Sequence, residues 1–253
     1  MTVAARRACV RRIVEFALDP SLDVDAAARA YRAAGHVQIA PFLAPGGVEA
    51  LRDHLLARAD WQRDLQLPGR QRRQFTAAEL AALSPAQVEA LRKLAAPTEA
   101  KGFRFSYESI GIVDHSGRRL DPDTLLDAFA AFLSAPDTVA VLRRIVGEER
   151  VAYADAFASR YAPGDFLSIH QDKHEGVARI AAYAFGLTRE WRPEWGGLLL
   201  FHDESGDVAR GLVPRWNALN LFTVPVDHSV SEVARFAPAP RLSVTGWLYP
   251  ARG

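Results

Sequence analysis

The chain has 253 residues, enough for one large domain with a sizeable core. Hydrophobic residues make up 49% and charged residues 24%, as in ordinary globular proteins, and no apolar run reaches the roughly 18 residues of a membrane helix. The net charge of +1 gives no general electrostatic reason to bind nucleic acid, so neither a membrane nor a nucleic acid is an expected partner.

The cysteine content and the N-terminus both favour a cytoplasmic protein. Cys9 has no second cysteine with which to form an internal disulfide, which suits a reducing compartment. Arginines interrupt residues 1–20, so this segment resembles an amphipathic helix more than the apolar core of a signal peptide. We therefore expect a cytoplasmic location.

The first part of the chain, residues 1–149, is expected to be mostly helical support. A glycine follows the first alanine-rich helical stretch and is a plausible stop for it. Residues 62–76 contain four arginines and are interpreted as an exposed loop, with a mobile lid over an acidic substrate as the alternative. Helices are predicted at 24–34, 48–59, 87–95, 122–133 and 137–147, and strands at 36–43 and 103–113.

From Arg150 onward the pattern changes to short runs rich in Val, Ala, Leu and aromatic residues. Pro, Gly, Asp and Asn separate these runs, which is typical of an all-β sandwich or barrel. The prediction is therefore a single domain over residues 1–253, mainly β with supporting α-helices. In it, a jelly roll formed by residues 150–250 packs against N-terminal helices.

Three side chains in the second half form a candidate metal site. His170 and Asp172 are two residues apart at the end of a predicted strand, where alternation points both side chains to one face. His228 lies in a distant predicted strand that would supply the third ligand. Two imidazoles and one carboxylate form a facial triad, which leaves open positions on an octahedral Fe(II) ion for oxygen chemistry. His202 and Glu204 offer a competing pair, which we assign to a loop or the surface.

Arg241 is the fourth candidate catalytic residue, at the start of the segment RLSVTGWLY. Arg241, Ser243, Thr245 and Trp247 alternate along this segment and so share one face of a strand. A guanidinium fork with a hydroxyl two residues on suits a carboxylate ligand. A buried arginine without an anion is unfavourable, so either a dicarboxylate ligand or a protein carboxylate must neutralise it. Trp247 is expected in the core or the pocket wall.

From Arg160 to Tyr249 the chain resembles the prolyl-hydroxylase-like branch of the 2-oxoglutarate/Fe(II) dioxygenases. The segments that carry the resemblance are RYAPGDFLSIHQD, WRPEWGGLLLF, VPRWNALNLFTVPVDHSVSEV and RLSVTGW, in that order. Details of these segments are most similar to bacterial and fungal relatives of ribosomal-protein prolyl hydroxylases. The resemblance implies a cupin-like double-stranded β-helix, Fe(II) at the triad positions and 2-oxoglutarate at Arg241.

The resemblance also implies roles for residues around the co-substrate. Tyr161 matches a family tyrosine that helps to bind 2-oxoglutarate, and Ser243 is expected to share the distal carboxylate with Arg241. Tyr183 is included as a further residue facing the same pocket. The pair Gly196–Gly197 is expected to relieve crowding where a strand enters the barrel.

The implied activity is hydroxylation of an unactivated C–H bond, of a prolyl residue in a protein or peptide or of an amino acid. Dioxygen and 2-oxoglutarate are consumed, succinate and CO2 are released, and ascorbate is expected to support turnover. Asp172 favours hydroxylation, because related halogenases have a small residue at this position.

Two other functions stay open at this point. An AlkB-like nucleic-acid demethylase is disfavoured because Trp247 stands where that group carries a second arginine. A non-catalytic, cupin-like metal- or ligand-binding protein is disfavoured because a mere metal binder has no need for a dicarboxylate clamp at Arg241.

Overall fold

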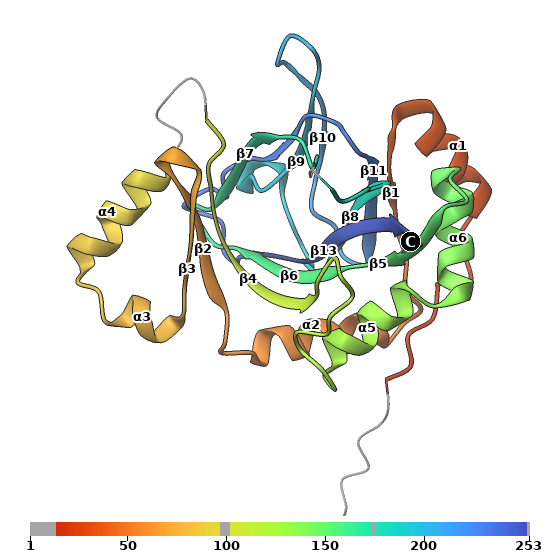
Figure 1. The fold of residues 1–253 in the computed structure, drawn as a ribbon, viewed down its shortest axis with the longest axis horizontal. Helices are drawn as coiled ribbons and strands as arrows, with labels where there is room; N and C mark the ends of the chain where they lie inside the picture. Colours follow the sequence, from red (N-terminus) through yellow and green to blue (C-terminus); the bar gives the residue numbers. More distant parts are fainter. Residues whose placement is uncertain (1–13, 97–101, 174–175, 252–253) are drawn as a thin grey trace, which may run out of the picture.

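The computed structural model describes residues 14–96, 102–173 and 176–251 (Figure 1). These residues form a mainly β molecule, in which one antiparallel sheet curves into a nearly closed barrel and six α-helices pack around it. The predicted fold class, mainly β with supporting helices, is confirmed. Most of the N-terminal segment expected to be an amphipathic helix, and His174, lie outside the described residues.

The helices all precede the last nine strands of the chain. They are α1 (Val24–Ala34), α2 (Gly47–Ala57), α3 (Ala77–Ala81), α4 (Pro85–Ala95), α5 (Leu125–Leu133) and α6 (Pro136–Val146). The strands of the first half are β1 (His36–Ile39), β2 (Gln62–Leu67), β3 (Gln71–Phe75) and β4 (Phe105–Val113). Those of the second half are β5 (Val151–Ala154), β6 (Ala156–Tyr161), β7 (Phe166–His170), β8 (Ala181–Gly186), β9 (Leu199–His202), β10 (Val208–Leu212), β11 (Ala218–Thr223), β12 (His228–Val230) and β13 (Arg241–Pro250).

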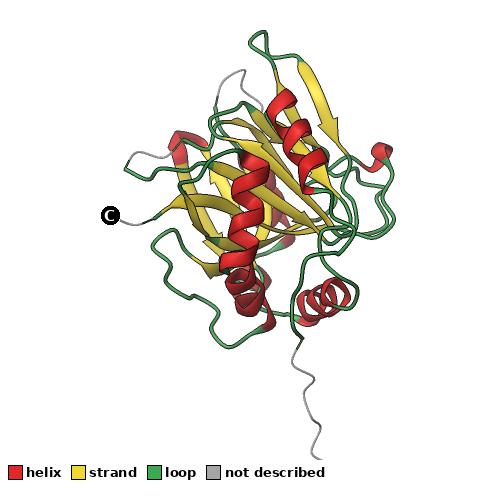
Figure 2. Ribbon diagram, turned by 90° about the vertical axis from the view of Figure 1, so that its right-hand side faces the viewer, coloured by secondary structure: helices red, strands yellow, loops and turns green. Residues whose placement is uncertain are grey.

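Local sequence signals explain where the main helices begin and end. The carboxylate of Asp23 accepts a hydrogen bond from the first turn of α1, and Gly35 ends that helix with a φ of 70°. Pro136 begins α6, and Gly147 ends it with a φ of 72°. These helices lie outside the sheet (Figure 2), and their apolar residues enter the main hydrophobic core.

The strand order is β1-β11-β8-β13-β6-β4-β7-β12-β9-β10, with β2 and β3 continuing from β4 and β5 pairing with β13. Residues along β8 alternate between two environments. Tyr183 and Phe185 enter the core that the helices cover, whereas Ala182 and Ala184 line a cavity on the other face. The sheet therefore separates a helix-covered core from an interior that holds the candidate site.

The arginine-rich segment 62–76 is a β-hairpin, so the prediction of an exposed loop is wrong. Strand β2 pairs with both β3 and β4 and thereby extends the sheet. Asp64 of β2 is 0% exposed and accepts hydrogen bonds from Arg72, Gln74 and Ser109. Arg63 forms ion pairs on the other face of the hairpin. Two of the four arginines thus satisfy carboxylates of the protein itself.

No single described helix is long and apolar enough to cross a membrane. Helices α5 and α6 reach that length and composition only together, as a pair bent by 55°. Their apolar side chains Leu126, Phe129, Leu142 and Ile145 are buried in the main core.

Candidate active site

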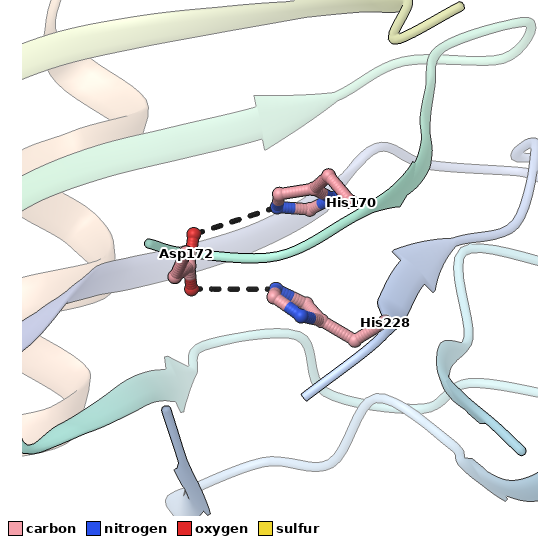
Figure 3. A group of neighbouring side chains, drawn as sticks. All are labelled: His170, Asp172 and His228. Atoms are coloured by element: carbon pink, nitrogen blue, oxygen red, sulfur yellow. Dashed lines mark ion pairs between the residues drawn. The ribbon is translucent and has the colours of Figure 1, made fainter. Parts of the chain in front are cut away.

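His170, Asp172 and His228 converge at one point inside the barrel (Figure 3). Strands β7 and β12 are antiparallel neighbours, and their register places His228 directly opposite His170. Asp172 follows β7 by two residues. One carboxylate oxygen lies 3.5 Å from Nε2 of His170 and the other lies 3.4 Å from Nε2 of His228. One donor atom from each residue fits within 4.8 Å of the others, which is the spacing of ligands around a single ion.

Backbone hydrogen bonds orient both imidazoles. Nδ1 of His170 donates to the carbonyl of Ser168, and Nδ1 of His228 donates to the carbonyl of Val226, each over 2.9 Å. With the proton on Nδ1, the lone pair of each Nε2 faces Asp172 and is free for a metal. The ring of Phe103 lies 4.9 Å from that of His170 and shields it from the side.

The charge states of the group also suit a cation. Burial opposes ionisation of Asp172, but the hydrogen bond with His170 and the charges of both histidines hold the pKa of its carboxyl below the ordinary value. Burial, together with the nearby His170, lowers the pKa of His228 to about 4. At neutral pH the carboxylate is therefore charged and the His228 imidazole is neutral, which is the form that binds metals.

A cavity of about 250 Å³ extends from the triad to Arg241. Arg241 begins β13 opposite Tyr161 of β6, and it is only 6% exposed. Among the described residues no carboxylate pairs with it, and its buried Nη1 has no hydrogen-bond partner. Burial lowers the pKa of this guanidinium, and the neighbouring Tyr161 ring lies 5.3 Å from its Cζ. An unsatisfied cation that faces a cavity is suited to an anionic ligand.

The predicted companions of Arg241 differ in their positions. Tyr161 lines the cavity and stacks on Tyr107 at 5.1 Å. Ser243 lies on the same face of β13, but it does not line the cavity, and its hydroxyl lies 2.9 Å from that of Ser159. Ser159 and Thr245 do line the cavity. Ser243 therefore supports the hydroxyl group of Ser159 from behind, and its assignment as a direct co-ligand stays a prediction.

Tyr183 points away from the cavity, so the expectation that it faces 2-oxoglutarate is wrong. Its neighbours Ala182 and Ala184 line the cavity, and the alternation of β8 sends Tyr183 to the opposite face. There its hydroxyl donates to the backbone carbonyl of Asp155 over 2.7 Å. Burial raises the pKa of this phenol well above its ordinary value.

Sequence reasoning missed Arg179, which forms one wall of the cavity with Trp247. The Nη1 group of Arg179 donates to the carbonyl of Asp172 over 2.9 Å, and its Cζ lies 3.7 Å from the centre of the Trp247 ring. A lone arginine just before an apolar strand is a weak signal, because its partners come from two distant segments. Trp247 lines the cavity, as expected for a wall residue.

The competing pair and the glycine pair also take definite places. The imidazole of His202 lies 2.8 Å from the hydroxyl of Ser229, and Glu204 is exposed, so neither joins the triad. A Cβ atom at Gly196 would lie 1.9 Å from the carbonyl oxygen of Glu232. Only glycine fits there, which agrees with the predicted relief of crowding.

Residues 156–249 match the family model described as the 2OG-Fe(II) oxygenase superfamily. The matched segment carries the sequence features of this superfamily. The matched residues begin at β6 and end in β13, and they include the triad and Arg241. This match and the triad together imply Fe(II) as the metal and 2-oxoglutarate as the co-substrate.

Proteins that are named as prolyl hydroxylases are among those similar to this chain. It is 36% identical to prolyl 3-hydroxylase OGFOD1 of Xenopus laevis over 115 residues, which are 43% of this chain and only 22% of that relative. A prolyl-4-hydroxylase from Pseudomonas putida superposes with a TM-score of 0.55 and 20% identity, covering 91% of this chain and 100% of the other. A Trichoplax adhaerens prolyl hydroxylase, solved with a hypoxia inducible factor peptide fragment, gives 0.56 and 14%, covering 90% and 89%. These structures share the double-stranded β-helix fold predicted above.

The residues of this oxygenase fit both implied groups. Two imidazole nitrogens and a carboxylate are the donor set of non-haem Fe(II) oxygenases, and the orphaned guanidinium across the cavity fits the distal carboxylate of 2-oxoglutarate.

Proposed function

We propose that the chain is a 2-oxoglutarate- and Fe(II)-dependent dioxygenase that hydroxylates an unactivated C–H bond of a prolyl residue in a protein or peptide. One observation carries the proposal: a single cavity joins the His170–Asp172–His228 triad to the buried, unpartnered Arg241. A metal site alone would need no cation at the far end of such a cavity.

Some residues of the chain would hold the iron and 2-oxoglutarate, and others would keep water out of the cavity. The triad holds the iron, Arg241 binds the distal carboxylate of 2-oxoglutarate, and Tyr161 packs beside it. Bound iron and 2-oxoglutarate supply oxygen activation coupled to decarboxylation of the co-substrate. Apolar walls, among them Phe105, exclude water from this space, and the fixed strands hold the reactants in one geometry.

The choice of a prolyl substrate rests on the relatives. OGFOD1 and the two solved structures are named as prolyl hydroxylases, and the solved Trichoplax enzyme is in complex with a peptide. The pocket wall formed by Arg179 and Trp247 suits a peptide, because an indole offers a flat apolar surface and a guanidinium can donate to a carbonyl. In this proposal ascorbate supports turnover in vitro, and the protein acts in the cytoplasm.

Mass spectrometry of a proline-containing peptide library and of cell extract tests the proposal. After incubation with Fe(II), ascorbate and 2-oxoglutarate, we expect peptides that gain about 16 Da, one oxygen atom, together with succinate. The variant Asp172→Ala lacks the carboxylate ligand and should produce neither. Equal turnover by Asp172→Ala, or release of formaldehyde from methylated nucleic acid in place of peptide oxidation, would refute the proposal.

A further inference from the structure

Asp155 is a buried carboxylate that the proposed reaction does not use. It lies between β5 and β6 and is 5% exposed. Oδ1 accepts a hydrogen bond from the backbone N–H of Trp247, and Oδ2 accepts one from the hydroxyl of Tyr249, both over 2.7 Å. Its own backbone N–H donates to the carbonyl of Trp247 over 3.2 Å. Asp155 therefore bonds to both the backbone N–H and the backbone carbonyl of Trp247, whose indole forms part of the cavity wall.

The same carboxylate acts on the other wall residue, Arg179. The Tyr249 hydroxyl donates to Asp155, and the nearby Arg179 guanidinium opposes the rise that burial causes in the pKa of this phenol. Burial raises the pKa of Asp155 to about 6, while its hydrogen bonds and the charge of Arg179 act in the opposite direction. At a pH of about 8 the carboxylate is therefore ionised and attracts the guanidinium.

Asp155 is tightly packed against the main chain of β13. A Cβ atom at Gly246, which lines the cavity, would lie 2.3 Å from the Asp155 carbonyl oxygen and 2.8 Å from its Oδ1. Tyr183 donates to that carbonyl from the core side. These close contacts restrict the position of Asp155 and thereby of the Trp247 backbone and the Tyr249 hydroxyl bonded to it.

We propose that Asp155 is a positioning residue for the substrate side of the cavity: through Tyr249 and the main chain of Trp247 it holds the Arg179 guanidinium against the indole. The inference rests on the proposed function for its meaning, since the wall it fixes would be the surface that meets the peptide. The co-substrate end at Arg241 lies elsewhere in the cavity and does not depend on Asp155.

The first test needs no substrate, because it measures the reactivity of Arg179 directly. Phenylglyoxal labelling at a pH of about 8, followed by peptide mass spectrometry, gives the rate at Arg179 relative to that at Arg143. Arg143 lies on α6 and donates to the carbonyl of Val151. In Asp155→Leu we expect the relative rate to rise about tenfold, the factor for losing one hydrogen bond to a charged group. Asp155→Asn keeps an acceptor for Trp247 but loses the negative charge, so its relative rate should rise less than that of Asp155→Leu.

Two further variants guard against misreading. Tyr249→Phe removes one oxygen atom only and should raise the relative rate several-fold, which decides the question if Asp155→Leu does not fold. Asp165→Asn removes the charge of an equally buried carboxylate, which is bonded to Arg63 and Ser106, and should leave the Arg179 rate unchanged. An unchanged relative rate in both Asp155→Leu and Tyr249→Phe would overturn the inference, and so would an equal rise at Arg143.

A kinetic split gives the second readout, with a peptide identified by its oxygen gain. In Tyr249→Phe and Asp155→Leu we expect the KM for the peptide to rise about tenfold while the KM for 2-oxoglutarate stays within about twofold. A rise in the KM for 2-oxoglutarate instead would overturn the inference. A wild-type enzyme that turns over no peptide contradicts the proposed function, whereas the labelling experiment still decides the role of Asp155.

Discussion

At the scale of single residues, the buried charge of Arg241 is unfavourable until an anionic ligand pairs with it. A desolvated guanidinium without a carboxylate lowers the stability of the free protein, and replacing such a charge by an apolar side chain of similar length is often neutral or stabilising. The stability of the protein and its affinity for 2-oxoglutarate are therefore opposed at this one position.

Arg241→Met should separate these two properties. We expect its unfolding temperature without ligand to equal or exceed that of wild type, because the unpaired charge is gone. With Mn(II) present throughout, 2-oxoglutarate at about 100 times its wild-type Kd should add about 2.7 kcal/mol of stability to wild type, and most of this increment should be lost in the variant. Circular dichroism under argon measures both.

The same substitution on the neighbouring strand gives a control. Arg160→Met breaks an ion pair with Glu108 on the outer face of β6, so it should lose some stability yet keep the ligand-dependent shift. If Arg241→Met kept the shift caused by 2-oxoglutarate, the assignment of Arg241 as its ligand would be wrong.

The site could be predicted where strand periodicity fixes direction, and it could not where periodicity leaves a choice. His170 and Asp172 at a strand end, and Arg241 with Thr245 along one strand, point the same way whatever the neighbours are. The prediction for Tyr183 was wrong because all residues of β8 are buried, so the sequence does not show which face of the strand is which. A shift of one residue exchanges the two faces. No pattern along the chain marks Arg179 as a neighbour of Trp247, since that contact exists only after the segments meet.

At the scale of elements, the β2–β3 hairpin shows how tertiary pairing overrides composition. Its sequence QRDLQLPGRQRRQF is too polar and too rich in arginine to resemble a strand pair. It nevertheless pairs along β4, because the buried carboxylate of Asp64 gives Arg72 an internal partner and Glu108 and Asp165 pair with Arg63. The five predicted helices and the two predicted strands at 36–43 and 103–113 are present in the structure, and their ends differ from the predicted ones by a few residues.

Arg72 and Arg73 form a matched pair for testing this account of the hairpin. Arg72 pairs with the fully buried Asp64, whereas Arg73 forms no ion pair with any described residue. We expect Arg72→Met to lower the free energy of unfolding by about 1–3 kcal/mol, because it leaves a buried carboxylate short of a partner. Arg73→Met should change it by less than about 0.5 kcal/mol.

Urea unfolding measures both variants, and hydrogen exchange locates the effect. Faster exchange of the β2 and β3 amides in Arg72→Met, with the amides of β8 and β13 unchanged, is the expected pattern. Equal losses of stability in the two variants would mean that the Asp64 contact does not hold the hairpin.

At the scale of the whole molecule, two buried groups make stability depend on pH in opposite directions. The folded pKa of Asp155, about 6, lies above its ordinary value of 3.8, so the folded state binds more protons and this contribution is lost as pH rises from about 4 to 6. The folded pKa of His228, about 4, lies below its ordinary 6.5, so stability grows as pH rises through the same interval.

Asp155→Asn should therefore expose the contribution of His228. We expect the metal-free variant to gain stability from pH 4 to 6.5 or so more steeply than wild type, by up to about 3 kcal/mol over the interval. Urea unfolding at several pH values, compared by slope and not by absolute stability, measures this. Parallel curves for the two proteins would mean that Asp155 keeps an ordinary pKa in the folded state.

The two ends of the cavity stand on strands of one hydrogen-bonded sheet, with the triad at β7 and β12 and Arg241 on β13. Because both ends are tied to hydrogen-bonded strands, the fold sets the distance between the metal site and Arg241, and with it the length of the acid that fits. A 2-oxo diacid with one methylene more would have to buckle, and one with a methylene less would fail to span the gap. We therefore expect the enzyme to choose its acid by chain length, and to reject 2-oxoadipate and oxaloacetate even though both carry the same charged groups.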